Sequence, residues 1–271
     1  MLLHIAERLG FTRRALLRLI PATVLTPLPA WARADRPEGE PANSLAVGDR
    51  PVSIRAHRSG KPGHFYLNLH ENESTAIAAA IGTVDRFGGE FYWLRAEGSR
   101  LISFRLRGRR YRFDPNRMFS DVGVEKNLHL LGAYSPEAAT EVRRFAMLFA
   151  GRLALRSRPL IVAVHNNARG GSFSISSYQR GGPEHLDAAS VSLNSNRDRD
   201  DFFLVTDARL YDYLRMRGHN VVLQANERVR DNGSLSIWAA RNRVTYINVE
   251  AQYGHLAEQT EMLADLQGWT T

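Results

Sequence analysis

The 271-residue sequence contains no cysteine, so disulfide bonds and thiolate chemistry are both excluded. Any transition-metal site must therefore use histidine, aspartate or glutamate side chains. Long apolar stretches are also absent, since no run reaches the roughly 18 residues that a conventional membrane span needs. The hydrophobic content of 44% is nevertheless enough for one large domain with a real core, or for two small ones.

Lysine is scarce, at Lys61 and Lys126 only, so the positive charge is almost entirely arginine. The formal net charge of +8 raises nucleic-acid binding as a hypothesis. Five arginines and one glutamate lie in residues 1–34, however, so half of the net charge belongs to that segment. The chain has no zinc-finger pattern, no RNP-like motif and no basic block with interleaved aromatic residues. We therefore expect no nucleic-acid partner.

The first 34 residues have the layout of a secretory signal peptide. Arg13 and Arg14 precede an apolar run over residues 16–28, and small residues alternate from Ala30 to Ala34 as at a cleavage site. The paired arginines resemble a twin-arginine signal, which exports folded proteins. The alternative, an amphipathic first helix, is opposed by three prolines. We expect an exported, periplasmic protein with no membrane span once the signal is removed.

Residues 35–50 are rich in Pro, Glu, Asp and Gly, and we expect a flexible leader there. Beyond it, apolar runs of strand type alternate with amphipathic segments of helix type. Strands are expected at 51–57, 64–70, 90–96, 101–113, 159–165, 201–207, 220–225 and 244–251, and helices at 74–88, 136–155, 208–218, 234–242 and 255–269. The segments at 90–96 and 101–113 are predicted to form a hairpin around residues 97–99. The polar stretch 168–200 is predicted to be a long functional loop, such as a specificity lid.

This alternation predicts an α/β fold, a single domain over residues 51–271 with a mostly parallel mixed sheet flanked by helices. Ligands of open α/β sheets bind beyond the carboxyl ends of the strands. Three expected strands end in useful groups: His70 with Glu73, then His165, then Glu250. A single histidine at a strand end is usually only solvated or capping, but the coincidence of three such ends indicates a site.

Zinc suits this set of side chains, because catalytic zinc commonly takes two histidines and one glutamate. His70 and Glu73 can chelate together from one tight turn, with His165 as the third ligand. A separate carboxylate is then needed as a base for the activated water, and Glu250 is the candidate. The same ligands would accept other divalent ions.

A further motif, FDPNRMF at residues 113–119, follows the first pair. The order His-x-x-Glu, Asp-x-Asn-Arg with a following aromatic, strand-end His and strand-borne Glu resembles the zinc carboxypeptidase superfamily. It covers about 180 residues of the chain. The short spacing from Glu73 to Asn116 is most similar to the aspartoacylase and succinylglutamate desuccinylase branch. The sequence departs from the common pattern at Glu71 and Pro115, neither of which is a proposed ligand.

The resemblance implies a zinc-carboxypeptidase-like fold and a role for each matched residue. His70, Glu73 and His165 would bind Zn²⁺, and Glu250 would be the general base and then the acid. Asn116 and Arg117 would hold the substrate's carboxylate, for which the planar guanidinium of arginine is well shaped. An additional arginine would stabilise the oxyanion, and Arg109 is the choice, with Arg110 as an alternative. Tyr178 and Tyr253 are candidates for a substrate-covering tyrosine.

These roles predict an exported metallopeptidase that cleaves a peptide or amide bond next to a free carboxylate, for which peptidoglycan-derived peptides are plausible substrates. An alternative is a deacylase of N-acyl amino acids, which also carry a free carboxylate. A non-catalytic peptide-binding protein is a third hypothesis, opposed by the complete set of ligands and base. A triad of Ser234, His255 and Asp207 can be imagined, but the sequence has no Gly-x-Ser-x-Gly elbow, and capping of a helix is the better account of Asp207.

Overall fold

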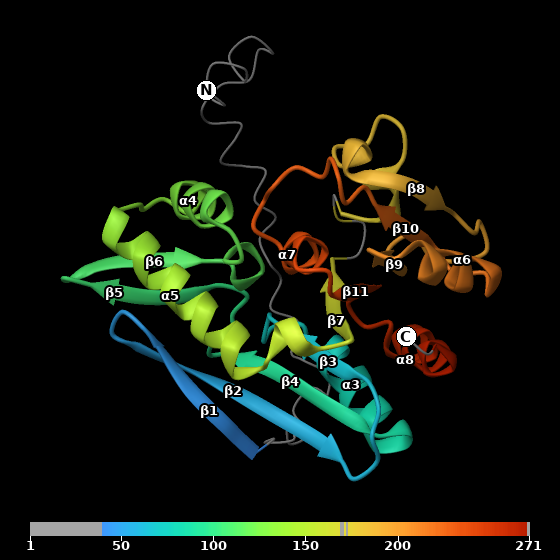
Figure 1. Cartoon of the computed structure of the whole chain (residues 1–271), viewed down its shortest axis with the longest axis horizontal. Helices are drawn as coiled ribbons and strands as arrows, with labels where there is room; N and C mark the ends of the chain where they lie inside the picture. Colours follow the sequence, from blue (N-terminus) through green and yellow to red (C-terminus); the bar gives the residue numbers. More distant parts are fainter. Residues whose placement is uncertain (1–39, 169–170, 172, 270–271) are drawn as a thin grey trace. The chain divides into compact units, whose positions relative to one another are not determined.

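The computed structural model describes residues 40–168, 171 and 173–269. The expected export signal at residues 1–34 lies outside the described residues. A nine-stranded sheet in the order β1-β2-β4-β3-β7-β11-β9-β10-β8 forms the centre of the described chain (Figure 1). Its strands are β1 (Glu40–Val47), β2 (Arg50–Ser59), β3 (Phe65–Asn68), β4 (Gly89–Arg95), β7 (Leu160–Asn167), β8 (Ala188–Ser192), β9 (Phe202–Val205), β10 (Val221–Gln224) and β11 (Thr245–Gln252).

The middle of the sheet is parallel. Strands β4, β3, β7 and β11 are parallel neighbours, whereas β1, β2, β8 and the β11–β9 junction add antiparallel pairs. Strand β7 shows why the parallel part lies in the centre, since its residues 160–165 are all buried and five of the six are apolar. The predicted α/β fold with a mixed sheet is confirmed.

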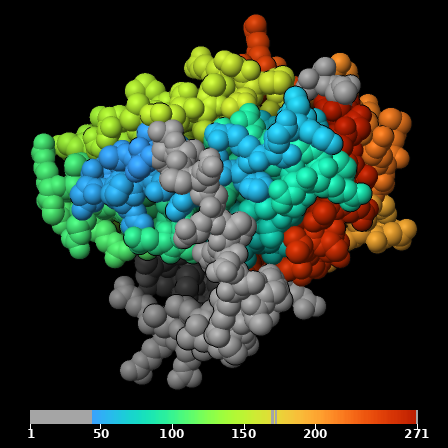
Figure 2. All heavy atoms as spheres, turned by 90° about the horizontal axis from the view of Figure 1, so that it is seen from below, coloured from blue at the N-terminus to red at the C-terminus, as the bar shows by residue number. Residues whose placement is uncertain are grey.

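Helices cover both faces of the sheet and enclose two apolar clusters. Helices α3 (Ser74–Phe87), α6 (Ala208–Met216) and α8 (Leu256–Asp265) contribute to one cluster, with the sheet residues Phe91, Val164 and Phe203. Helices α4 (Asp121–Leu130), α5 (Pro136–Arg152) and α7 (Leu235–Arg241) contribute to the other. Figure 2 shows the cyan-to-teal segments that include α3 beside the red α8, and the two helices are in contact. None of the described helices is long and apolar enough to cross a membrane.

The prediction of a flexible leader at 35–50 is wrong for residues 40–47, which form the edge strand β1. This strand pairs antiparallel with β2. Leu45 and Val47 are buried, whereas Ser44 and Ala46 are exposed, which is the alternation of a strand with one buried face. The Pro- and Glu-rich composition of the segment obscured this short pattern.

The hairpin expected between residues 90–96 and 101–113 is also wrong. Strand β4 lies between β2 and β3, while 101–113 folds on itself as β5 (Ile102–Leu106) and β6 (Arg109–Phe113). The turn contains Arg107 and Gly108, both at positive φ, of 50° and 78°. Two positive φ values are typical of the tight turn whose twist matches an antiparallel pair. The sequence also gave no prediction of α4 or of β8, which lies inside the expected loop 168–200.

A buried histidine beside α8 makes stability depend on pH. His219 is 2% exposed and packs edge-on against Phe203, and its Nε2 lies 2.7 Å from Asp265 Oδ2. Burial lowers the pKa of His219 and outweighs the opposing effect of Asp265. In the unfolded chain the imidazole regains its ordinary pKa of about 6.5. The unfolded state therefore binds a proton first as pH falls below about 6.5, and stability should be lost from there down to the lower pKa of the folded state.

We expect the melting temperature of the wild type to fall more steeply between pH 7 and pH 5 than that of His219→Gln. Carboxylates elsewhere titrate equally in both proteins, so the difference between the two curves isolates His219. Parallel curves would contradict this account.

Candidate metal centre and active-site cavity

The carboxyl ends of three adjacent strands meet at one edge of the sheet. His70 follows β3 by two residues, in the turn that leads into α3. In that turn the Asn68 side chain accepts from the His70 backbone N–H at 3.0 Å, and the Glu73 N–H donates to the His70 carbonyl at 3.0 Å. His165 lies in β7 directly opposite Glu250 of β11. The expectation that these strand ends are parallel neighbours is confirmed.

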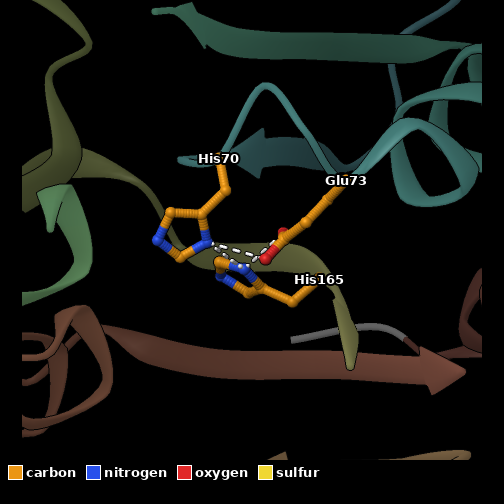
Figure 3. A group of neighbouring side chains, drawn as sticks. All are labelled: His70, Glu73 and His165. Atoms are coloured by element: carbon orange, nitrogen blue, oxygen red, sulfur yellow. Dashed lines mark hydrogen bonds and ion pairs between the residues drawn. The ribbon is translucent and has the colours of Figure 1, made fainter. Parts of the chain in front are cut away.

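His70, Glu73 and His165 point toward one another (Figure 3). The Nδ1 atom of His70 lies 2.8 Å from Glu73 Oε1, and the Nδ1 atom of His165 lies 2.9 Å from Glu73 Oε2. The two Nδ1 atoms are 3.2 Å apart. One ligand atom from each residue therefore falls within 4.8 Å of the others, and all three residues are buried. Two imidazoles and one carboxylate converging in this way fit a zinc ion.

The electrostatics of the cluster suit a cation. Burial lowers the pKa of His70, but the carboxylates of Glu73 and Asp114 outweigh burial and raise that pKa to about 9. Burial raises the pKa of Glu73, but the two histidines outweigh it and hold that pKa well below its ordinary value. The buried carboxylate is thus kept ionised by the positive charge around it, which a metal ion would supply in place of a proton.

Two further residues hold the ligands in position, and neither role was predicted from the sequence. Asp114 Oδ1 lies 2.8 Å from His70 Nε2, so it orients the ring and leaves Nδ1 for the cluster. Carboxylates commonly hold metal-binding histidines in this manner. Asn68 donates from Nδ2 to Glu73 Oε2 at 3.0 Å and to the Val164 carbonyl at 2.8 Å. The motif at 113–119 contained Asp114, whereas nothing in the sequence distinguished Asn68.

Glu250 lies beside this cluster in a buried position. The carboxylate is 7% exposed and accepts from Asn248 Nδ2 at 3.0 Å. Burial raises the pKa of Glu250, His165 lowers it and the nearby Glu73 raises it further, so the net direction is upward. A raised pKa brings a carboxylate closer to the range in which it can both take up and release a proton.

Asn116 and Arg117 lie on a 3₁₀ turn, Pro115–Arg117, that is capped by Asp114. The Oδ1 atom of Asn116 accepts from the Leu235 backbone N–H at 3.0 Å, which leaves the amide N–H groups for a ligand. Gly233 packs so closely on this turn that an added Cβ would stand 2.4 Å from the Arg117 carbonyl, and its φ is +78°. The close approach fixes the turn against the start of α7.

Arg109 and Arg110 do not reach the site. Both are exposed on β6, where the Arg109 guanidinium lies over the Tyr111 ring, and neither lines the cavity described below. Arg100 is there instead: its Nη1 donates to Glu73 Oε1 at 2.9 Å and its Nε donates to Asp114 Oδ2 at 3.2 Å. Arg109, which was expected to stabilise the oxyanion, therefore lies outside the cavity, and Arg100 is an arginine that lies beside the cluster.

A cavity of about 780 Å³ joins these groups. It is lined by Glu73, His165 and Glu250, by Asn116 and Arg117, and by Arg100. The two candidate tyrosines, Tyr178 and Tyr253, line it as well. The imagined triad is not assembled, because Asp207 caps α6 and His255 pairs with Asp201 at 2.9 Å. Capping by Asp207 is thus confirmed.

A scan against protein-family models finds no match, and no curated protein matches the chain. Among solved structures, the murein-tripeptide amidase MpaA from Escherichia coli O157 is 12% identical, with a TM-score of 0.43, over 90% of this chain and 97% of its own. A succinylglutamate desuccinylase/aspartoacylase from Rhodobacter sphaeroides is 13% identical, with a TM-score of 0.41, over 80% and 58%. A candidate metallopeptidase from Shewanella amazonensis is 13% identical, with a TM-score of 0.40, over 83% and 85%.

Any conclusion about activity therefore depends on the side chains of the cavity.

Proposed function

We propose that this protein is a zinc-dependent hydrolase that cleaves a peptide or amide bond next to a free carboxylate. The observation that supports it is that one cavity is lined by Glu73 and His165 of the His-Glu-His cluster, by the buried Glu250 and by the pair Asn116 and Arg117. The cluster can hold a metal, the glutamate can transfer protons, and the Asn-Arg pair can bind a carboxylate. These are the three functions that such a hydrolysis requires.

In this proposal His70, Glu73 and His165 hold the zinc ion. Bound zinc supplies Lewis-acid chemistry, which polarises a carbonyl and makes water more acidic. Asn116 and Arg117 bind the substrate's carboxylate and so fix which bond lies over the cluster. Glu250 takes a proton from the attacking water and later gives it to the leaving nitrogen. Arg100 donates to the oxygen on which negative charge develops.

We propose further that the protein acts after export on peptides of the cell wall. The arginine pair and apolar run of residues 1–34 support export. The cavity volume of about 780 Å³ leaves room for a substrate larger than an acyl amino acid. A deacylase of N-acyl amino acids would use the same carboxylate site and is the outcome against which the peptidase must be tested.

The test compares three substrate sets on zinc-loaded protein: peptides with a free terminal carboxylate, the same peptides as terminal amides, and N-acyl amino acids. Hydrolysis of the free peptides, with little of the amides, is expected. Hydrolysis of N-acyl amino acids alone would assign the deacylase instead. Peptide binding without turnover, unchanged by Glu250→Ala, would indicate a binding protein.

Replacing Arg117 by alanine is expected to lower kcat/KM for free-carboxylate substrates by about 10²–10³-fold, since two charge-assisted hydrogen bonds are lost. Residual hydrolysis of the terminal amides should not change, because they carry no carboxylate. Arg112→Ala is the matched control, since that arginine is exposed on β6. An equal loss on amides and free peptides would mean that Arg117 supports the fold rather than the substrate.

Two single variants distinguish Arg100 from Arg109 as the residue that stabilises the oxyanion. Arg100→Ala is expected to lower kcat by about 10²–10³-fold, the usual effect of losing one oxyanion donor, and Arg109→Ala by less than about threefold. Arg100 also bonds to Glu73 and Asp114, so zinc content must be measured in each variant. The proposed role is contradicted if Arg100→Ala loses activity only in proportion to lost zinc.

A further inference from the structure

The far part of the cavity, beyond Glu250, has polar groups that the proposed reaction does not use. Tyr246, Asn248 and Glu250 occupy alternate positions of β11, so they share one face of the strand, and all three line the cavity. Asn248 is therefore the neighbour of the proposed base Glu250 on this face, toward the start of β11. Opposite it on β9 is Leu204, which also lines the cavity.

The Asn248 side chain presents an unpaired acceptor. It is 9% exposed, and its Nδ2 donates to Glu250 Oε1 at 3.0 Å. A carboxylate only accepts hydrogen bonds, so this contact fixes the amide with Oδ1 as the free atom. That Oδ1 is buried and has no hydrogen-bond partner among the described residues. A buried acceptor without a partner is costly, and a ligand that donates to it would remove the cost.

A second group on the cavity wall carries excess negative charge. Glu184 and Asp187, from the segment before β8, both line the cavity and lie within hydrogen-bonding reach of each other. Arg230 is their shared cation, with Nη2 at 3.1 Å from Glu184 Oε2 and 2.9 Å from Asp187 Oδ2. Its side chain is 57% exposed and does not line the cavity. One guanidinium thus faces two carboxylates, which leaves one negative charge on the cavity side.

The pKa directions of neighbouring side chains also indicate excess negative charge at this wall of the cavity. Burial raises the pKa of Glu184, and the adjacent Asp187 raises it further, since two carboxylates so close resist ionising together. Tyr178 lies within electrostatic reach of both Glu184 and Glu250, which places the acidic wall and the proposed base around one side chain. Arg117 also lines the cavity and is committed to the substrate's carboxylate in the proposed function, while the Arg228 guanidinium bonds to the Leu186 and Ala188 carbonyls.

We propose that this part of the cavity binds a cationic nitrogen, so that the residue bearing the substrate's free carboxylate has a basic side chain. The ammonium group would donate to Asn248 Oδ1 and pair with Glu184, while Arg117 and Asn116 hold the carboxylate. This inference rests on the proposed function, because it takes the position of the carboxylate from it. It assigns specificity to Glu184 and Asn248, neither of which takes part in the proposed bond cleavage.

The test measures binding to zinc-loaded protein by calorimetry, and each ligand is checked for hydrolysis afterwards, so that binding and turnover are measured separately. The ligands are Nα-acetyl-lysine and Nα-acetyl-norleucine, which have the same carbon chain and differ in the terminal amine. Both enantiomers of each are used. Binding of the lysine derivative is expected to be about 10- to 100-fold tighter, as for one charge-assisted hydrogen-bonded pair in a buried site.

In Glu184→Gln the preference should shrink to less than about threefold, whereas binding of the norleucine derivative should not change. Glu227→Gln is the matched control, because that glutamate is exposed and outside the cavity. It should keep the full preference. A preference that survives in Glu184→Gln would overturn the role of Glu184.

The remaining outcomes separate the two proposals. Equal binding of the two ligands, or tighter binding of norleucine, would overturn the inference and leave the hydrolase intact. Failure to bind either ligand, together with no hydrolysis in the substrate panel, would overturn the proposed function and this inference with it.

Discussion

Replacing Glu250 by glutamine is expected to lower kcat by about 10²–10⁴-fold, the usual contribution of a general base, with zinc content unchanged. Glutamine keeps the shape of the side chain but cannot take a proton from water. The contact with Asn248 survives, because Asn248 Nδ2 can donate to the Oε1 atom of the new amide as it does to the carboxylate, which leaves Asn248 Oδ1 free. Binding of the acetylated amino acids should change little, so the loss should lie in kcat rather than in KM.

The pH profile of the wild type supplies a second readout. The base works only when it is ionised, and burial raises the pKa of Glu250 above its ordinary value. Activity should therefore fall on the acid side as pH decreases through the pKa that Glu250 has in the zinc-loaded protein, where the charge of the ion opposes the effect of burial. Any residual activity of Glu250→Gln should lack this acid limb.

Glu258→Gln, which makes the same change at an exposed site of α8, is the control and should retain full activity. A fall in kcat of less than about tenfold in Glu250→Gln would assign the proton transfer to another group. Loss of zinc from that variant would instead give Glu250 a part in the metal site.

The strand ends were predictable because a short run of buried apolar residues is easy to recognise. Residues 159–165 and 244–251 contain such runs, and each ends in a single charged or imidazole side chain, His165 or Glu250. Once the fold is α/β, the rule that ligands bind at carboxyl ends brings these side chains together without further information. The structure brings His70, Glu73 and His165 together at this edge of the sheet, as the argument predicts.

Arg100 was missed because its position depends on a pairing that the local sequence does not reveal. In the β5–β6 hairpin Ile102 pairs with Phe113, so the residues just before β5 lie beside the residues just after β6. Arg100 is thereby brought to Asp114, whereas Arg109 lies at the opposite, turn end. Closeness in sequence favoured Arg109, but antiparallel pairing places the more distant residue at the site.

The role of Asn68 could not be predicted from the sequence for a different reason. Its partners are Glu73, five residues away, and the carbonyl of Val164 in the neighbouring strand. A buried asparagine at a strand end has many ordinary explanations, and only the register of β3 beside β7 shows that it bonds to Glu73 and Val164 together. Roles of this kind follow from tertiary pairing and not from residue type.

Removing a proposed zinc ligand and removing the residue that orients a ligand should lower the zinc affinity by clearly different amounts. Asp114→Asn keeps His70 but replaces the ionised acceptor that orients its ring, so zinc affinity is expected to fall about 10–100-fold. His165→Ala removes a ligand atom, and no other described residue belongs to the cluster to replace it. The zinc affinity of His165→Ala should therefore fall by well over about 100-fold, and hydrolysis should fall to background.

Metal content after dialysis against graded chelator, followed by titration with zinc, measures both effects. Zinc loading should also raise the melting temperature of the wild type, because a metal that binds only the folded state stabilises it by mass action. The raised pKa of His70, about 9 in the metal-free protein, means that a proton competes for the same Nδ1 region. Zinc affinity should therefore weaken as pH falls below about 9, with a proton released on binding.

The chain offers a matched control for the loss of an imidazole in His185→Ala, since His185 is exposed and its Nδ1 lies 2.7 Å from the Gly182 carbonyl. It should bind zinc as the wild type does. If His165→Ala and His185→Ala retained equal zinc, the metal would lie elsewhere, and the hydrolase proposal would lose the group that activates its water. If Asp114→Asn lost as much zinc as His165→Ala, Asp114 would have to be counted among the ligands, and the ring of His70 would bridge the two carboxylates rather than bind through Nδ1.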